Sequence, residues 1–249
     1  MTVSVAIAVA ASGCGGGDSS TAGAPPRSSA IELAAGTAPS VELCGFGEVG
    51  GAQASGAVKN EPPAPGVYQY ATTGTERGKP LPARTNTTVT PGTARAGLTC
   101  FGSEHRYTPK VRTADVYILR GEDIYIVADG FVTPNYVQSV KPRPAILALS
   151  GTQQAWRGTF AGATSGTYSV EIVGRRTFTI GGKRVKAVGL SSTATFRGET
   201  TGSQKRETWL ATGRALVVRE TGTSVLQLGG DVERLSYTDR LLSLEPSGG

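Results

Sequence analysis

Residues 177–188 read Thr-Phe-Thr-Ile-Gly-Gly-Lys-Arg-Val-Lys-Ala-Val. Two runs of strand-favouring residues flank the pair Gly181-Gly182. Both central positions of a type I′ turn need a positive φ, which glycine adopts without steric cost. The stretch therefore predicts a tight β-hairpin. From Tyr168 to Leu244 the chain repeats this pattern of short β-favouring runs separated by glycine-containing turns.

The pattern continues upstream, so the whole of residues 66–246 is expected to form one antiparallel β domain. The most apolar runs, 114–120 and 123–128, are expected to be central strands covered on both faces. A change of phase within 183–196 predicts a β-bulge near Ala187 and Val188. Residues 133–144 hold three prolines and are expected to form a loop, and 145–149 could be a strand or a short helix. Further strands are expected at 66–74, 84–90, 94–101, 106–111, 156–160, 166–173, 176–180, 203–211, 215–221, 224–228 and 233–244.

These strands, with no stretch of helical period, predict an all-β fold: a large curved antiparallel sheet, half-barrel or barrel built from a meander. Closure or curling limits the exposed edges of so many strands. The chain has 249 residues. A domain of somewhat under 200 residues hides on the order of 70% of its unfolded surface, so it needs no metal to fold.

The N-terminus carries the most specific motif. Residues 1–10 are apolar and are followed by Ala11, Ser12, Gly13, Cys14 and three glycines. This run resembles the end of a bacterial lipoprotein signal peptide with its lipobox. The resemblance implies that residues 1–13 are a signal peptide remnant and that Cys14 carries a diacylglyceryl group. Two acyl chains, at ~0.8 kcal/mol per buried methylene, anchor a protein durably.

That resemblance implies an exported protein held in the cell membrane or the outer membrane. The basic segment that usually opens such a peptide is missing, so the start is expected upstream or the chain has been trimmed. The apolar run is too short to span a bilayer. The alternative is an apolar N-terminus with a chance cysteine.

Residues 14–65 are rich in Gly, Ala, Ser and Pro and are expected to form a tether. Residues 45–50 match G-x-G-x-x-G literally, but no amphipathic helix follows to hold a pyrophosphate. No nucleotide cofactor is therefore expected. Cys44 and Cys100 are the two cysteines left after lipidation, and in an exported protein they predict one disulfide. Two separate buried thiols are the alternative.

Charge is unevenly distributed along the chain. Residues 14–65 carry two basic and five acidic side chains, whereas 66–249 carry the other 23 basic and 14 acidic ones. Five basic residues gather around the Gly181-Gly182 hairpin and form a candidate patch for an anionic partner. Nucleic acid is a poor candidate for an exported protein, and a plain solvated surface is the alternative. The patch consists of Arg175, Arg176, Lys183, Arg184 and Lys186.

Catalytic and metal-binding motifs are not apparent. His105 is the only histidine, so an H-E-x-x-H zinc site is excluded, and it is expected to lie on the surface or in a turn. No G-x-S-x-G motif occurs. Glu122, Asp123 and Asp129 could serve glycoside chemistry or bind calcium, but their glycine-flanked positions favour turn residues. We therefore expect no metal, no cofactor and no enzyme activity.

The late meander strengthens the resemblance to bacterial lipoproteins. Its segments include Gly-Gly-Lys-Arg-Val-Lys-Ala-Val at 181–188, Glu-Thr-Trp-Leu-Ala-Thr-Gly-Arg-Ala-Leu at 207–216 and Tyr-Thr-Asp-Arg-Leu-Leu-Ser-Leu at 237–244. In plan the chain is distantly similar to half-barrel carriers such as LolA and LppX, although it lacks the helices that those carriers pack on the sheet.

The expected function is therefore that of a lipid-anchored, non-enzymatic envelope protein that binds an apolar or amphiphilic ligand. One alternative is a structural or assembly lipoprotein that binds another envelope protein. The other is a hydrolase without a recognisable motif. A deep apolar cavity would favour carriage, a filled core would favour assembly, and His105 beside a serine or two carboxylates in a cleft would favour catalysis.

Overall fold

The computed structural model describes residues 60–92, 99–121, 123–133, 136–140 and 154–247. Thirteen strands and no helix lie in these ranges, and none of the described residues forms a helix that could cross a membrane. The strands are β1 Gly66–Glu76, β2 Lys79–Pro80, β3 Arg84–Pro91, β4 Thr99–Arg106, β5 Arg112–Arg120, β6 Asp123–Thr133, β7 Tyr136–Val140, β8 Ala155–Phe160, β9 Thr164–Ile180, β10 Lys183–Gly198, β11 Thr200–Ala211, β12 Val217–Leu228 and β13 Asp231–Leu241.

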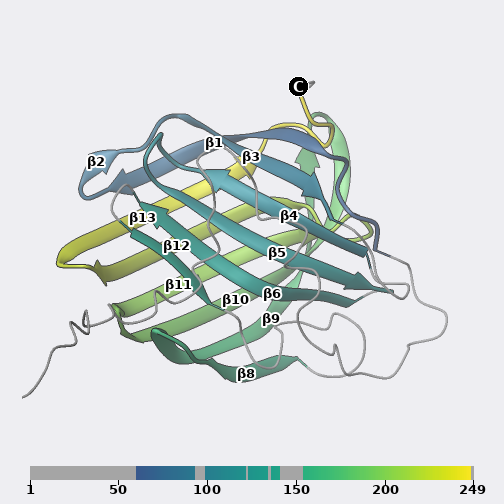
Figure 1. Cartoon of the computed structure of the whole chain (residues 1–249). Helices are drawn as coiled ribbons and strands as arrows, with labels where there is room; N and C mark the ends of the chain where they lie inside the picture. The colour runs from purple at the N-terminus through teal and green to yellow at the C-terminus, as the bar shows by residue number, and fades with distance from the viewer. Residues whose placement is uncertain (1–59, 93–98, 122, 134–135, 141–153, 248–249) are drawn as a thin grey trace, which may run out of the picture.

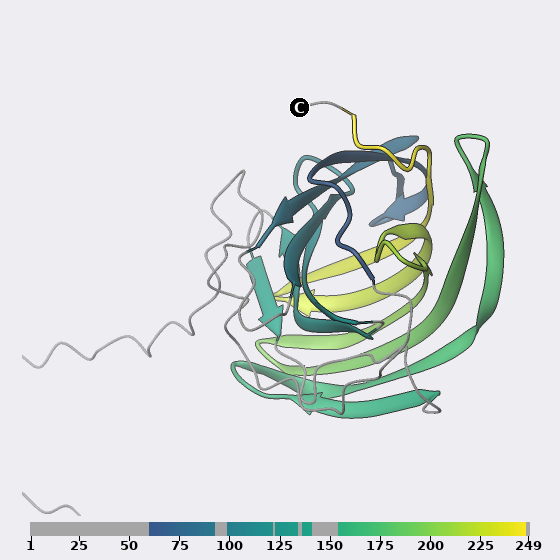
Figure 2. The same cartoon turned by 90° about the vertical axis from the view of Figure 1, so that its right-hand side faces the viewer.

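All of these strands belong to one antiparallel sheet, in the order β7-β6-β5-β4-β3-β1-β13-β12-β11-β10-β9-β8, with the short β2 paired to β1. Two meanders, β1 to β7 and β8 to β13, meet where β1 pairs β13 from Tyr70↔Leu241 to Glu76↔Leu235. The sheet curls on itself, so that β4 to β6 face β9 to β12 across a concave interior (Figures 1 and 2). The predicted all-β half-barrel is confirmed.

The hairpin of β9 and β10 forms as the sequence predicts. Gly181 and Gly182 have φ values of 54° and 78°, the left-handed conformation of a type I′ turn. The hairpin is the longest in the sheet, and its tip projects beyond the neighbouring strands (Figure 2). The register shifts between Gly189 and Leu190, which pair with Gly174 and Ile172. A bulge is therefore present close to the predicted place, with its extra residue, Val173, on β9.

Four segments differ from the expected strand pattern. Residues 166–173 and 176–180 form the single strand β9, and 215–221 and 224–228 together form β12. The expected strand at 106–111 is instead the end of β4 and a turn closed by Tyr107 N–H donating to Val111 C=O at 3.0 Å. Residues 136–140 of the expected loop form the edge strand β7. Residues 145–149 and the expected features before residue 60 lie outside the described residues.

The interior of the half-barrel is filled by apolar and aromatic side chains, including Tyr70, Phe101, Tyr117, Leu226 and Tyr237. A smaller apolar cluster lies on the other face of β4, β5 and β6 and includes Cys100, Val116, Ile118, Tyr125, Val127 and Ala128. β5 and β6 are thus buried on both faces, as expected. They lie near one edge of the sheet, however, and their expected central position is wrong.

The last residues before β1 contact the sheet. Asn60 is buried, and its side-chain Oδ1 accepts a hydrogen bond from Gly213 N–H at 2.9 Å. Glu61 N–H donates to Gly213 C=O at 3.0 Å, and Tyr68 Oη donates to Ala64 C=O at 2.9 Å. Residues 60–65 are therefore held against the β domain.

Candidate functional site

Strand register collects an unusual set of charges on the concave face. Asp115 on β5 lies directly opposite Asp129 on β6, and Glu220 on β12 lies directly opposite Asp239 on β13. Like charges at opposed positions of neighbouring strands repel each other. The concave face thus carries two opposed carboxylate pairs, one on each wall of the half-barrel.

Arg206 on β11 reaches across the interior toward the first pair. Its Nη1 lies 3.4 Å from Asp129 Oδ2 and 4.0 Å from Asp115 Oδ2. The Arg206 side chain is only 10% exposed, and its Nε and Nη2 atoms have no hydrogen-bond partner among the described residues. A buried donor without a partner costs free energy, so these two nitrogen atoms are available to donate to an acceptor.

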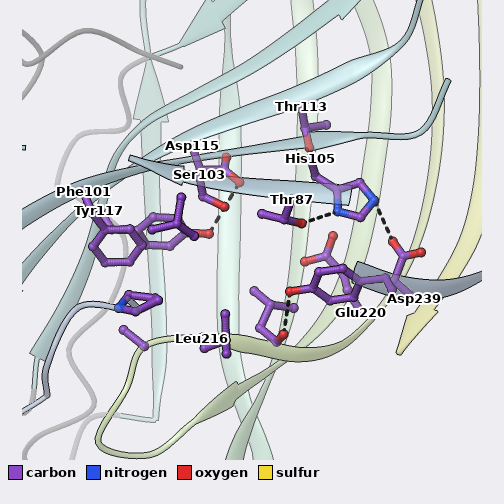
Figure 3. Close-up of a pocket in the computed structure, with 15 residues that line it drawn as sticks. Thr87, Phe101, Ser103, His105, Thr113, Asp115, Tyr117, Leu216, Glu220 and Asp239 are labelled. Atoms are coloured by element: carbon purple, nitrogen blue, oxygen red, sulfur yellow. Dashed lines mark hydrogen bonds and ion pairs between the residues drawn. The ribbon is translucent and has the colours of Figure 1, made fainter. Parts of the chain in front are cut away.

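His105 lies at the centre of a second network (Figure 3). Its Nδ1 is 2.7 Å from Thr87 Oγ1, and its Nε2 is 3.3 Å from Asp239 Oδ2. The other oxygen of Asp239 accepts a hydrogen bond of 2.6 Å from Thr72 Oγ1, which also lies 2.6 Å from Thr85 Oγ1. The histidine ring is therefore held between a hydroxyl and a carboxyl group.

Glu220 is bound by hydroxyl groups. Its Oε1 accepts a hydrogen bond of 2.5 Å from Tyr237 Oη, and its Oε2 accepts one of 2.7 Å from Thr208 Oγ1. Tyr237 reaches Glu220 because its ring lies across Gly222, its direct partner on β12. A Cβ atom on Gly222 would overlap that ring. Both oxygens of Glu220 are thus satisfied from within the sheet.

Burial determines the protonation of these groups. Burial raises the pKa of Asp115 well above its ordinary value, and the carboxylate of Asp129 raises it further, while Arg206 opposes both. Burial also raises the pKa of Asp129, against the effect of Arg206. The pKa of Asp239 rises from 3.8 to about 7, chiefly through burial. Burial and then Arg206 lower the pKa of His105 from 6.5 to about 3, so this histidine is neutral at ordinary pH.

Two small cavities flank the side chains of Tyr117 and Glu220, which line both. One, of about 30 Å³, is lined by His105, Thr87 and Asp239 and is the pocket of Figure 3. The other, of about 80 Å³, is lined on the opposite side by Arg206 together with apolar side chains of β6, β9 and β10. Ligand pockets usually measure roughly 300–1,000 Å³. Neither of these two cavities is therefore large enough to enclose a long acyl chain.

The predicted basic patch divides between two faces of its hairpin. Pairing of Arg184 with Thr179 and of Lys186 with Thr177 places them on the same face as Arg175. Arg176 and Lys183 point to the other face, where the Arg176 guanidinium lies 5.0 Å from the centre of the Trp209 ring and Lys183 Nζ is 4.0 Å from Glu245 Oε1. The sequence thus predicts a group of five, of which three share one exposed face.

Two predictions on single residues are wrong. His105 lies inside β4 and is buried among Tyr70, Tyr107 and Asp239, not on the surface or in a turn. Asp129 lies in the middle of β6 and lines the Arg206 cavity, so it is not a turn residue. Glycine-flanked acids resemble turns in sequence, and here Gly130 is simply a strand residue.

Other predicted residues are only in part within the described structure. Asp123 is the first residue of β6, and Glu122 lies outside the described residues. Cys100 is buried in β4 and disulfide-bonded. Its predicted partner Cys44, like Cys14 and the glycine motif at 45–50, lies outside the described residues. The Cys44–Cys100 pairing therefore stays a prediction.

Sequence reasoning did not single out Arg206, Asp115, Glu220 or Asp239. A usable indication was present: each charge occupies a position that alternation assigns to the buried face of a strand. Within the described residues no group of three or more His, Cys, Asp or Glu side chains is arranged to hold a metal ion. The concave cluster is instead a hydrogen-bonding and ion-pairing network.

Comparisons with known proteins give little further guidance. No family model matches the chain, and no curated protein matches it in sequence. Among solved structures, the chain is similar to the crystal structure, at 2.70 Å resolution, of a "putative lipoprotein" from Parabacteroides distasonis ATCC 8503. The match has a TM-score of 0.41 and 9% identity and covers 76% of this chain and 99% of that one. A likeness of this degree carries no argument about function.

Proposed function

We propose that this chain is an exported envelope protein, anchored by a lipid on Cys14, whose β domain binds a small amphiphilic ligand without transforming it. The anchoring rests on the lipobox-like residues that precede Cys14. The binding rests on one observation, the cavity beside Arg206. A small cavity that combines an apolar wall with unsatisfied buried donors suits a ligand with an acceptor head and a short apolar part.

The atoms without a hydrogen-bond partner beside this cavity indicate the chemistry of the ligand head group. Glu220 already accepts two hydrogen bonds from hydroxyl groups, and Asp129 contacts Arg206. The groups in need of a partner are the Nε and Nη2 donors of Arg206. A carbonyl or carboxyl oxygen would satisfy them, while Val170 and Leu190 would contact the adjoining apolar part. The volume of about 80 Å³ limits the enclosed portion to a short head and its first carbons.

Native mass spectrometry of the full chain, purified from its own envelope, tests this function. The wild type should carry an added mass that denaturation releases as a small organic molecule. Arg206→Lys should lose that mass, because lysine keeps the positive charge near Asp129 but lacks the planar fork of donors. Arg240→Met, an exposed arginine on β13, is the matched control and should keep it.

A clean apo mass for the wild type would overturn ligand binding and favour the alternative of an assembly lipoprotein that binds another envelope protein. Retention of the same mass by Arg206→Lys would place the ligand elsewhere on the protein. Both outcomes leave the anchoring at Cys14 unaffected, because that is tested by membrane fractionation.

The exposed face of the β9–β10 hairpin supports a contact with an anionic membrane surface. Arg175, Arg184 and Lys186 lie on this face, and the described residues place no carboxylate within ion-pair distance of any of them. Replacing all three by glutamine should weaken cosedimentation with anionic vesicles, and the wild-type binding should fall as salt rises. Equal binding by the triple variant would remove the hairpin from the membrane contact.

A hydrolase is the second candidate, and the His105 network favours it. Thr87 Oγ1, the His105 ring and Asp239 follow one another in the order of a nucleophile, a base and an orienting acid. Against it, the lowered pKa of His105, about 3, makes the ring a weak base. Hydrolysis of p-nitrophenyl acetate that Thr87→Val abolishes and Thr87→Ser retains would establish this activity; equal rates in all three proteins would exclude it.

A further inference from the structure

A third hollow lies away from both interior cavities and shares no residue with them. It measures about 590 Å³, within the usual size range of ligand pockets. The β1–β2 turn and β2 form one side of it, the turn between β4 and β5 forms another, and Glu233 of β13 also lines it. Seven of its nine lining residues have polar or charged side chains, and these include Arg77, Lys79 and Lys110.

Glu233 contributes a buried acceptor to this hollow. Its side chain is 1% exposed, and its Oε2 accepts a hydrogen bond of 2.7 Å from Arg77 Nε. Its other oxygen, Oε1, is buried and has no hydrogen-bond partner among the described residues. A buried carboxylate oxygen without a donor is costly, and a ligand hydroxyl would satisfy it.

Arg77 is held in a strained conformation beside this carboxylate. Its φ of 48° is the left-handed conformation that residues other than glycine adopt rarely, and it precedes Gly78 at 79° in the turn. The ion pair with Glu233 and a backbone hydrogen bond of 2.7 Å from Arg77 N–H to Arg234 C=O hold it there. A strained backbone conformation persists only where surrounding contacts hold it in place, and such residues are common at binding sites.

Two further cationic side chains, those of Lys79 and Lys110, line the hollow. Lys79 and Lys110 are exposed, and among the described residues neither ammonium group lies within ion-pair distance of a carboxylate. With the outer nitrogens of Arg77 they offer donors to an anion, while Glu233 Oε1 offers an acceptor to a hydroxyl. The fitting ligand therefore combines an anionic group with hydroxyl groups.

We infer that this hollow is a separate binding site for a small phosphorylated polyol, with the phosphate at Lys79 and Lys110 and a hydroxyl at Glu233. This chemistry occurs in a free glycerol phosphate and in the head group of phosphatidylglycerol. The inference does not rest on the Arg206 cavity, and either site can fail its test without the other.

Isothermal titration of the full-length Cys14→Ala chain with sn-glycerol 3-phosphate tests the site. Inorganic phosphate and glycerol serve as probes for each half of the ligand and should bind at least tenfold more weakly. Lys110→Gln should weaken sn-glycerol 3-phosphate at least tenfold, whereas Lys205→Gln, an exposed lysine on β11, should leave it unchanged. Glu233→Gln should weaken sn-glycerol 3-phosphate at least tenfold and leave inorganic phosphate unchanged.

Vesicles distinguish the two sources of the ligand. If the source is a lipid, the wild type should bind phosphatidylglycerol vesicles more tightly than phosphatidic acid vesicles of equal surface charge. Lys110→Gln should remove this difference in affinity. If only the free compound binds, the source is soluble. If the wild type binds neither sn-glycerol 3-phosphate nor phosphatidylglycerol vesicles, the proposed site is wrong. It is also wrong if binding is tight but Lys110→Gln leaves it unchanged. Both results can be obtained even if Glu233→Gln does not fold.

Discussion

Asp239→Asn should change how the stability of the protein depends on pH. Asp239 is 2% exposed on β13, receives a hydrogen bond from Thr72, and faces His105 and Glu220. Its pKa rises from 3.8 to about 7 on folding, chiefly because burial disfavours the charged carboxylate. Asparagine keeps the size and the acceptor oxygen but cannot ionise, so the variant removes one titration and little else.

The sign and size of the effect follow from linkage. Between about pH 4 and pH 7 the folded state holds a proton on Asp239 that the unfolded state has lost. The contribution of Asp239 to the free energy of unfolding is therefore greatest at low pH and falls as the pH rises from about 4 to about 7. With these two pKa values, the free energy of unfolding drops by about 2.5 kcal/mol between pH 5 and pH 8, and by ~4 kcal/mol over the whole window.

Urea unfolding at several pH values from 5 to 8, followed by tryptophan fluorescence, measures this slope. The free energy of unfolding of the variant should fall by about 2.5 kcal/mol less than that of the wild type over this range. Asp115 and Asp129 also have raised pKa values, but they contribute equally to both proteins. Asp231→Asn, an exposed acid on the same strand, should keep the wild-type slope. Identical slopes for Asp239→Asn and the wild type would refute the reasoning, because Asp239 would then ionise in the folded protein as it does in the unfolded chain.

Three further predictions concern other parts of the chain. Gly222→Ala should lower the free energy of unfolding by about 1–3 kcal/mol, because the new methyl group overlaps the Tyr237 ring; a loss below about 0.5 kcal/mol in urea titration would contradict that packing. Cys14→Ala should move the protein from the membrane to the soluble fraction of fractionated cells, and continued membrane retention would exclude the lipid anchor. Peptide mapping without reductant should find Cys44 linked to Cys100, and free thiols at both would exclude that bridge.

The local features of the fold could be predicted from sequence because they depend on neighbours along the chain. Gly181 and Gly182 supply the positive φ values of a hairpin turn, and alternation identifies the strands on either side. The strand breaks predicted near residues 174 and 222 are wrong for an identifiable reason. Gly222 is a strand residue, small because the ring of Tyr237 lies over it, and single glycines of this kind resemble turns in sequence.

The concave cluster could not be predicted because it depends on pairings between distant segments. His105 meets Asp239 only because β1 and β13, the two ends of the domain, pair in the middle of the sheet. Arg206 meets Asp129 only because the sheet curls and brings β11 opposite β6. Neither contact can be recognised from the residues adjacent to it in the sequence. Alternation could show that these charges point inward, but it could not show which of them meet.

The same cluster explains why Arg206 has donors left for a ligand. Three carboxyl groups, Asp115, Asp129 and Glu220, lie near Arg206 on the concave face. If Asp115 and Asp129 were both ionised, their attraction would favour a close two-pronged salt bridge with the guanidinium. Their pKa values are instead raised by burial, and Arg206 Nη1 stays 3.4 Å and 4.0 Å from them. The raised pKa values favour the neutral forms of these acids and so weaken the repulsion between them. The Nε and Nη2 donors of Arg206 have no hydrogen-bond partner among the described residues.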